Sequence, residues 1–345
     1  MTMILVLEFL LGATLALVTL NDVVGTVVIP GRARGLFQVV RRLVLVNLPV
    51  WRALRRREDG LSAAFAPSML VQAFIIWIAL LILGFGLMTH ALADSFDPAL
   101  PSFPQALFVA GSGLATVGLS ETDATGLARW VVMGAGFCGL AVMTLAITYL
   151  LMVQGSVSGR DAGILKLLTS AGSPPSGLAV LERYAALGMV QRLPALMHDA
   201  RDWCADVLQS HASHPSLIYF RSASAASGWP ATLGALMDMS LATVYLLDEP
   251  ALRGPAVLLE EQGARMADSL VALITLEHAK APTPRAEAMR LVERLAAAGY
   301  TLRADPDIDG YCHRRARHAG CVRSLAEHLG SAEAPLIPKA APSPV

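Results

Sequence analysis

The sequence predicts an all-α membrane protein: three transmembrane helices, a re-entrant helix and loop between the second and third, and a helical cytoplasmic domain. The 345 residues are 54% hydrophobic and only 16% charged, whereas about a quarter of the residues in a soluble domain are charged. Three apolar stretches each reach the roughly 20 residues that are needed to cross a bilayer. The second half of the chain has instead the periodicity of soluble amphipathic helices.

The three apolar stretches lie in the first half of the chain. We expect them at about residues 3–29, 67–92 and 127–153. The first nine residues contain no Lys or Arg, although a secretory signal peptide begins with a positive region. The first stretch is therefore expected to be a transmembrane helix of the mature protein.

The charges between the stretches predict their orientation. The segment from residue 30 to 60 contains eight arginines, whereas residues 93–128 contain no Lys or Arg. The positive-inside rule places the Arg-rich loop and the C-terminal half in the cytoplasm, and the N-terminus and the 93–126 loop outside. We expect a multi-pass protein of the bacterial inner membrane.

The Arg-rich loop contains an apolar segment, residues 36–51, that Arg41 and Arg42 interrupt. Two interpretations stay open. The segment is either a helix at the inner membrane interface, with its arginines toward lipid headgroups, or a solvated linker helix.

The first stretch contains two acidic residues, Glu8 near its outer end and Asp22 near its inner end. Ionisable residues within a membrane usually face protein or water. We expect both to lie at the interfaces, and an ion pair between Asp22 and an arginine of the following loop is the second possibility.

The outer loop contains an apolar segment, residues 103–114, with the sequence F-P-Q-A-L-F-V-A-G-S-G-L. Pro104 suits the first turn of a helix, where its missing N–H has no cost. A helix over residues 104–112 would be about 14 Å long, which is half a bilayer. Residues 115–121 follow as A-T-V-G-L-S-E. Non-helical backbone at membrane depth occurs only where protein or a water-filled cavity surrounds it.

Residues 67–153 resemble the pore domain of the two-transmembrane potassium channel superfamily, whose filter has the form T-V-G-Y-G. The likeness covers about a quarter of the chain and identifies an outer helix, a pore helix, a filter and an inner helix. It implies that the carbonyls of Thr116, Val117 and Gly118 line an ion path with the Thr116 hydroxyl, and that Leu119 and Ser120 complete the filter. Because the chain carries one such string and the family forms tetramers, four chains are implied.

The string departs from the family pattern after Gly118. Leu119, Ser120 and Glu121 stand where Tyr, Gly and Asp usually follow. Ser120 resists the positive φ that a glycine adopts. Leu119 cannot form the hydrogen bond that the usual tyrosine forms with the pore helix. Glu121, with Asp123, would keep an acidic outer mouth that concentrates cations. The resemblance therefore implies cation conduction, with K⁺ preferred or tolerated and weak discrimination against Na⁺.

The third stretch contains Gly134, Gly136 and Gly139. Small residues allow close helix packing in lipid, and this role is favoured. A gating hinge is the alternative, for which Gly139 lies closest to the middle of the stretch.

The C-terminal half is expected to form an all-helical cytoplasmic domain, with helices at about residues 177–189, 192–210, 230–248, 255–279, 284–298 and 312–329. Residues 231–247 are apolar enough to suggest a fourth transmembrane helix. The segment is short and has Asp238 at its centre, so a buried soluble helix is favoured.

No catalytic motif is present, so we expect no enzyme activity. Cys312, His313, His318 and Cys321 lie close in sequence, but their spacing is unlike common zinc motifs and favours a basic, solvated helix. We expect no metal site and no cofactor other than the permeant K⁺ or another monovalent cation. The net charge of zero gives no indication of nucleic-acid binding. The expected partners are the lipid bilayer and three further copies of the chain, and the ligand of the cytoplasmic domain stays open.

Together these observations predict a tetrameric cation channel, or alternatively a non-conducting membrane receptor or scaffold with a degenerate pore loop. The domain boundaries follow from the same segments: an N-terminal transmembrane helix (1–30), an Arg-rich loop (31–66), a pore domain (67–153), a linker (154–176), a cytoplasmic helical domain (177–330) and a disordered tail (331–345).

Overall fold

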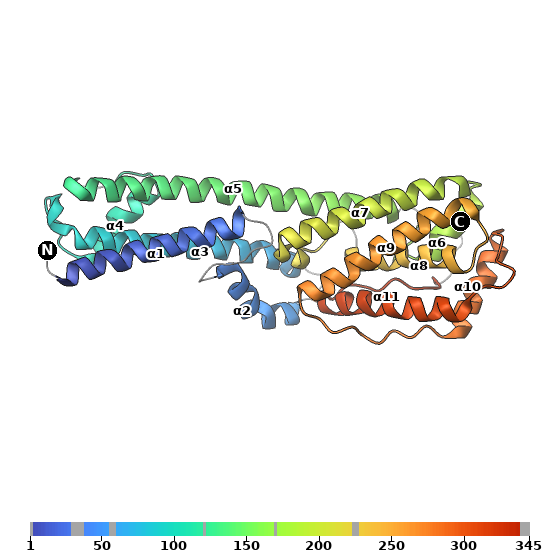
Figure 1. Ribbon diagram of the computed structural model, residues 1–345. Coiled ribbons are helices and arrows are strands. Elements are labelled where there is room, and N and C mark those ends of the chain that lie inside the picture. Colours follow the sequence, from blue (N-terminus) through green and yellow to red (C-terminus); the bar gives the residue numbers. More distant parts are fainter. Residues whose placement is uncertain are drawn as a thin grey trace. The chain divides into compact units, whose positions relative to one another are not determined.

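The computed structural model describes residues 3–28, 38–54, 60–119, 122–168, 171–222 and 228–338. Its residues form two compact units. Unit 1 comprises Met1–Pro49 and Phe65–Gln154, and unit 2 comprises Val50–Ala64 and Gly155–Val345. The all-helical prediction is confirmed, because the described residues form eleven α-helices and one two-stranded sheet (Figure 1).

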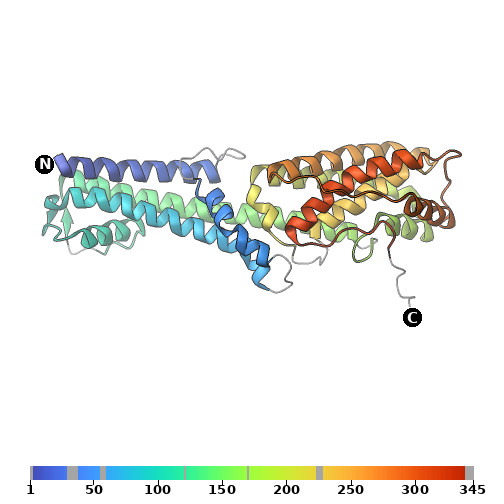
Figure 2. The same ribbon diagram turned by 90° about the horizontal axis from the view of Figure 1, so that it is seen from below.

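Unit 1 is built around three long apolar helices that lie side by side in Figures 1 and 2: α1 (Met3–Val27), α3 (Gly60–Ala91) and the first part of α5 (Gly126–Leu168). Each is long and apolar enough to span a membrane. Large apolar side chains such as Leu17, Phe137 and Leu151 are exposed on them. A helix that is apolar on all sides is typical of a membrane span, and these three helices coincide with the three predicted spans.

Helices α1 and α3 approach each other at two glycines. A Cβ added to Gly12 would lie 2.5 Å from the carbonyl oxygen of Gly84, and one added to Gly84 would lie 3.0 Å from the carbonyl oxygen of Gly12. Close approach of backbones at small residues is the usual way in which helices associate in lipid.

Asp22, near the C-terminal end of α1, is only 2% exposed. Its carboxylate accepts hydrogen bonds from the backbone N–H groups of Gln38 (2.7 Å) and Val39 (3.2 Å) and from the indole Nε1 of Trp77 (2.9 Å). Val39 begins helix α2 (Val39–Leu54). In the described residues these donors, rather than an arginine, satisfy the carboxylate, which also places negative charge at a helix N-terminus.

The second acidic residue of α1, Glu8, pairs with His90 near the end of α3. Its Oε1 lies 2.7 Å from the His90 Nδ1, and the ring of His90 packs edge-on against Phe103. Both acidic residues of α1 thus contact other helices of unit 1.

Helix α2 exposes apolar side chains together with its arginines. Leu45 is 60% and Val46 is 73% exposed, and Arg41 and Arg42 are exposed beside them. A solvated linker helix would turn its polar face outward. The combination of exposed apolar and basic residues therefore favours the interpretation as an interfacial helix.

The expected linker that begins at residue 154 is helical up to Leu168, because α5 runs through Gly155 and Gly159. A glycine costs only about 1 kcal/mol in a helix interior, and packing outweighs this cost. Within unit 2, a Cβ at Gly163 would lie 2.1 Å from a ring carbon of Trp203, whose Nε1 donates to the Arg160 carbonyl (3.0 Å). The ring thus needs a glycine at this position of α5.

Unit 2 contains six further helices, whose bounds lie within about six residues of the predicted ones: α6 (Gly177–Ala186), α7 (Leu193–Ser213), α8 (Gly228–Tyr245), α9 (Pro250–Leu273), α10 (Arg285–Ala297) and α11 (Ile308–Leu329). Short 3₁₀ helices cover Ala93–Ser95 in unit 1, and Val190–Arg192 and Pro215–Tyr219 in unit 2.

Helix α8 is the core of unit 2. Every residue from Trp229 to Thr243 is buried, and the helix packs against α6, α9 and α11. Asp238 at its centre is bound by Arg315 of α11. The segment is therefore a buried helix of the bundle rather than a fourth transmembrane helix.

The C-terminal segment differs in part from the expected disordered tail. Residues 331–338 lie against the helices of unit 2, where Leu336 is 3% exposed and its carbonyl accepts a hydrogen bond from Ser176 (3.5 Å). An apolar segment gains free energy by burial even without secondary structure. Residues 339–345 lie outside the described part of the chain.

Candidate functional site

The outer loop of unit 1 leaves α3 and returns to α5 through a short two-stranded ribbon. Strand β1 (Phe96–Asp97) pairs antiparallel with β2 (Asp123–Ala124), with Phe96 opposite Ala124. The backbone N–H and the hydroxyl of Thr125 both donate to the carbonyl of Ser95 at 2.8 Å. These bonds fix both ends of the loop near each other, so residues 98–122 form a closed excursion between two apolar helices.

The excursion contains helix α4 (Phe103–Leu114), where the sequence predicts a helix over residues 104–112. Pro104 lies in the first turn, as expected. Twelve residues correspond to about 18 Å of helix. Its buried face comprises Ala106, Val109, Ala110 and Leu114, and Figures 1 and 2 show it as a short helix near the N-terminal end of α1.

The three glycines of α5 have different surroundings. A Cβ added to Gly139 would lie 1.8 Å from the carbonyl oxygen of Leu114, the last residue of α4. At Gly136 the nearest atom would be the Gly113 carbonyl oxygen at 3.4 Å, and at Gly134 a ring atom at 3.8 Å. The backbones of α4 and α5 thus touch at Gly139, which agrees with the packing role. The hinge stays a prediction.

The C-terminus of α4 ends in a Schellman motif. The N–H of Thr116 donates to the Gly113 carbonyl (2.9 Å) and the N–H of Val117 to the Ser112 carbonyl (3.0 Å). Thr116 has a φ of 58°, in the left-handed region that is normally occupied by glycine at this place. A β-branched residue there is strained, and such strain concentrates at functional sites.

The next two residues continue this pattern. The N–H of Gly118, which has a φ of 73°, donates to the Ser112 carbonyl (3.5 Å), and the N–H of Leu119 donates to the Ser112 hydroxyl (2.6 Å). All four N–H groups from Thr116 to Leu119 are therefore directed back to the end of α4. Their four carbonyls accept no hydrogen bond from any residue that the structure describes, and all four residues are exposed.

Ser112 is the residue of this site that the sequence analysis missed. It binds three of the four N–H groups through its carbonyl and its hydroxyl. Apart from Gln105, it is the only residue of the α4 sequence with a polar side chain. This isolated hydroxyl, three residues before Ala115, is the feature of the sequence that indicates a role for Ser112 at the end of the helix.

The remaining residues predicted for the pore are placed only in part. Ser120 and Glu121 lie outside the described residues. Asp123 is exposed in β2, where it is paired in register with the exposed Asp97 of β1. Two acidic residues thus lie at the base of the excursion.

The Cys/His group of α11 does not converge. His318 binds Glu260 of α9 (2.8 Å) and Cys321 donates to Asp268 (3.4 Å). A different set, Asp268, His278 and Cys321, has its potential ligand atoms within 4.8 Å of one another. Sequence spacing does not indicate this set, because about 50 residues separate Cys321 from Asp268.

This set is poorly prepared to bind a metal. Burial, and then the hydrogen bond to Asp268, raises the pKa of the Cys321 thiol to about 12. The thiolate that metals require is therefore disfavoured. Arg317 already contacts the same carboxylate at 3.3 Å, so an incoming metal would compete with a guanidinium.

Comparison with known proteins gives no match: no family model fits the chain, and no curated protein and no solved structure is significantly similar to it. The resemblance to potassium channels rests on residues 67–153 alone.

Proposed function

We propose that the chain is the subunit of a homotetrameric cation channel of the bacterial inner membrane, with an atypical filter at Thr116–Glu121 and with K⁺ preferred or tolerated. One observation carries the proposal. The N–H groups of Thr116 to Leu119 are all engaged with the end of α4, while the four residues are exposed and their carbonyls accept no hydrogen bond from the residues that the structure describes. A row of free carbonyls replaces the hydration shell of a monovalent cation.

Helix α4 supports the same chemistry. The C-terminal end of a helix carries partial negative charge, and the four residues directly follow this end. The Thr116 hydroxyl, which has no hydrogen-bond partner in the described part of the chain, supplies a further oxygen. Because one chain offers one row of carbonyls, four rows around an axis would enclose an ion. Leu119 and Ser120 in place of the usual residues account for a proposed weak discrimination between K⁺ and Na⁺.

In the proposed arrangement the N-terminus is outside and unit 2 is cytoplasmic, as the arginine distribution predicts. Helix α2, with exposed Leu45, Val46, Arg41 and Arg42, would contact the inner leaflet of the bilayer. Unit 2 would assemble the tetramer or bias the gate.

A second candidate function is a non-conducting membrane receptor or scaffold. The Schellman motif favours it, since Thr116 and Val117 complete a helix end within a single chain. In that case water hydrates the exposed carbonyls and unit 2 carries the signal.

The test of conduction is cation flux into liposomes that contain the purified protein, with K⁺ and Na⁺ gradients in parallel. Gly118→Ala is the test variant and Gly126→Ala the control. Both glycines have positive φ (73° and 53°) with no atom within 4 Å of an added Cβ. The channel predicts loss of flux in the first variant alone. Equal flux in both variants, or equal permeability to anions, would contradict it.

The Thr116 hydroxyl offers a second comparison. Thr116→Val keeps the branched side chain but removes the oxygen, whereas Thr116→Ser keeps the oxygen. A channel loses K⁺ flux in the first variant and retains it in the second. Native mass measurement in detergent should give four times the chain mass of 36.5 kDa; a monomer would rule out the four-fold pore.

A further inference from the structure

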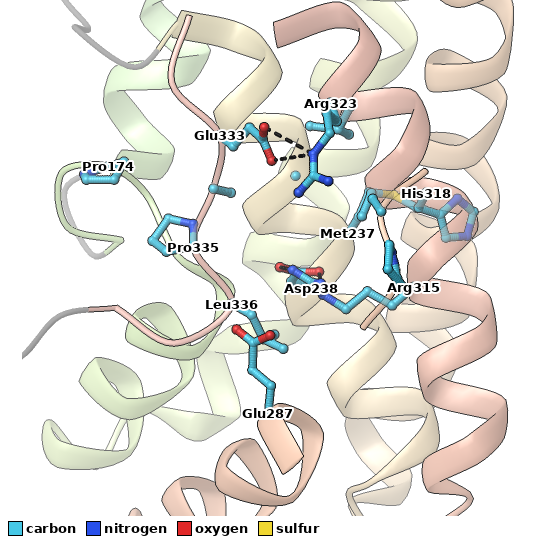
Figure 3. A pocket seen from close by; sticks show the side chains of 16 residues that line it. Pro174, Met237, Asp238, Glu287, Arg315, His318, Arg323, Glu333, Pro335 and Leu336 are labelled. Atoms are coloured by element: carbon cyan, nitrogen blue, oxygen red, sulfur yellow. Dashed lines mark hydrogen bonds and ion pairs between the residues drawn. The ribbon is translucent and has the colours of Figure 1, made fainter. Parts of the chain in front are cut away.

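Unit 2 contains a cavity of about 350 Å³ between α8, α10 and α11, closed on one side by the C-terminal segment Glu333–Leu336 (Figure 3). This volume lies in the range of small-molecule sites, about 300–1,000 Å³. The lining includes the apolar side chains of Met237, Val322, Pro335 and Leu336. It also includes charged groups, and their pairing decides what the cavity can bind.

The two arginines of the cavity are already neutralised. Arg315 binds both carboxylate oxygens of Asp238, at 2.8 and 3.0 Å, and also donates to the Thr283 hydroxyl at 3.1 Å. Arg323 binds both oxygens of Glu333, at 3.1 and 3.2 Å. The two-fold pair of Arg315 with Asp238 leaves it little attraction for an anionic ligand. Arg323 uses only its Nε toward Glu333 and is more exposed than Arg315.

Glu287 is the third acidic group of the cavity, and its charge acts at longer range on Arg315 of α11, whose pKa it helps to raise. It lines the cavity from α10 and is half-buried, and its side chain makes no hydrogen bond or ion pair with any described residue. Figure 3 shows its carboxylate directed toward Leu336 and Asp238. Three acidic residues and two arginines line the cavity, and His318 is paired with Glu260 (2.8 Å). The carboxylates of the lining thus outnumber its arginines by one.

We propose that this cavity binds a small organic cation, an ammonium or amidinium group on an apolar body, with Glu287 as its counter-ion. A half-buried carboxylate gains most from a partner that replaces its water with charged hydrogen bonds. The apolar side chains of the lining, among them Leu336, toward which the Glu287 carboxylate is directed, receive the body of the ligand. A metal ion fits less well, because hard cations require several oxygen ligands and Asp238 and Glu333 are already bound to arginines.

The C-terminal segment provides the entrance. The Arg323–Glu333 pair is partly exposed, with side chains 36% and 43% accessible, and exposed ion pairs contribute only about 0–1 kcal/mol. The segment can therefore separate from α11 at Glu333 at low cost while Leu336 stays buried.

The test is calorimetric titration of the full-length protein in detergent with matched probes. The cations are butylammonium, phenethylammonium and benzamidinium. The neutral counterparts are 1-butanol, 2-phenylethanol and benzamide, and the anionic counterparts are pentanoate, 3-phenylpropionate and benzoate. We expect saturable binding of at least one cation, at least tenfold tighter than its neutral and anionic counterparts.

Glu287→Gln should remove this preference, with at least a tenfold loss of cation affinity. Glu293→Gln is the matched control, because Glu293 lies on the same helix, is exposed and does not line the cavity. If Glu287→Gln lowers the melting temperature, Glu287→Asp gives the same test by withdrawing the carboxylate by one methylene. Absence of binding by all three cations, equal affinity across the charge series, or unchanged affinity in the Glu287 variants would overturn the proposal. Because binding is measured without flux, the result does not depend on conduction.

Discussion

Gly139→Ala should displace the end of α4, because α5 and α4 touch at this glycine. The added Cβ would lie 1.8 Å from the Leu114 carbonyl oxygen and 2.6 Å from its carbonyl carbon. Real Cβ atoms essentially never come within 3.0 Å of another atom, so the backbones must separate by at least 1.2 Å, the difference between 3.0 and 1.8 Å. The obstacle is backbone and cannot move to another rotamer.

The magnitude follows from a comparison with Gly134→Ala in the same helix. Both changes add the same methyl group and the same helix propensity, about 1 kcal/mol in favour of alanine. At Gly134 the methyl meets only a ring atom at 3.8 Å, an ordinary contact. The difference between the variants is therefore the cost of overpacking, typically 1–3 kcal/mol, and we expect about 3 kcal/mol because the contact is backbone to backbone.

The assay is the unfolding temperature of each variant in detergent, followed by flux in liposomes. A difference of about 3 kcal/mol corresponds to a melting temperature roughly 5–10 °C lower for Gly139→Ala than for Gly134→Ala. Because Thr116–Leu119 follow Leu114 directly, flux should fall as well. The reasoning is refuted if Gly139→Ala melts at or above Gly134→Ala, since α4 and α5 would then not be in contact at this position.

Three further predictions concern buried polar groups. Burial, and then the charge of Arg160, lowers the pKa of His211 to about 3, so the stability gained from the neutral ring is complete above pH 6.5 and is lost as the pH falls toward 3. Between pH 6.5 and 5 this loss is about 2 kcal/mol. In His211→Phe the melting temperature should therefore depend less on pH over this range. A pH dependence equal to that of the unmodified protein would contradict this prediction. The hydrogen bond from His318, with Arg314, lowers the pKa of Glu260 to about 2. The stabilisation by the ionised Glu260 is complete above pH 4.5 and is lost as the pH falls toward 2. Glu260→Gln should therefore lower the free energy of unfolding by about 3 kcal/mol at pH 7 and by little at pH 2. An equal loss of unfolding free energy at both pH values would show that the charge is not responsible. Asp22→Asn replaces an acceptor oxygen by a donor, so it should cost about 2 kcal/mol and speed hydrogen exchange at the start of α2; unchanged exchange there would contradict the cap.

The candidate site could be located from the sequence, but its geometry could not. Thr116-Val117-Gly118 and its apolar flanks are contiguous, so their position between two spans can be read directly. That their N–H groups are bound by Ser112 depends on how α4 ends, and hydropathy contains no information about this. Gly139 was recognised as a small residue, while its contact with Leu114 required the position of one helix against another.

The sequence by itself determined the helices and the three spans, because hydropathy and helical periodicity are properties of neighbouring residues. Only the tertiary structure decided the partners of the polar groups. Asp22 meets Trp77, and Glu260 meets His318, across more than 50 residues of chain. Glu287 lines the cavity with Asp238 and Arg315, although about 50 and 30 residues separate it from them in the chain. A buried charge must be satisfied by whichever donors packing brings to it, and packing depends on the whole chain.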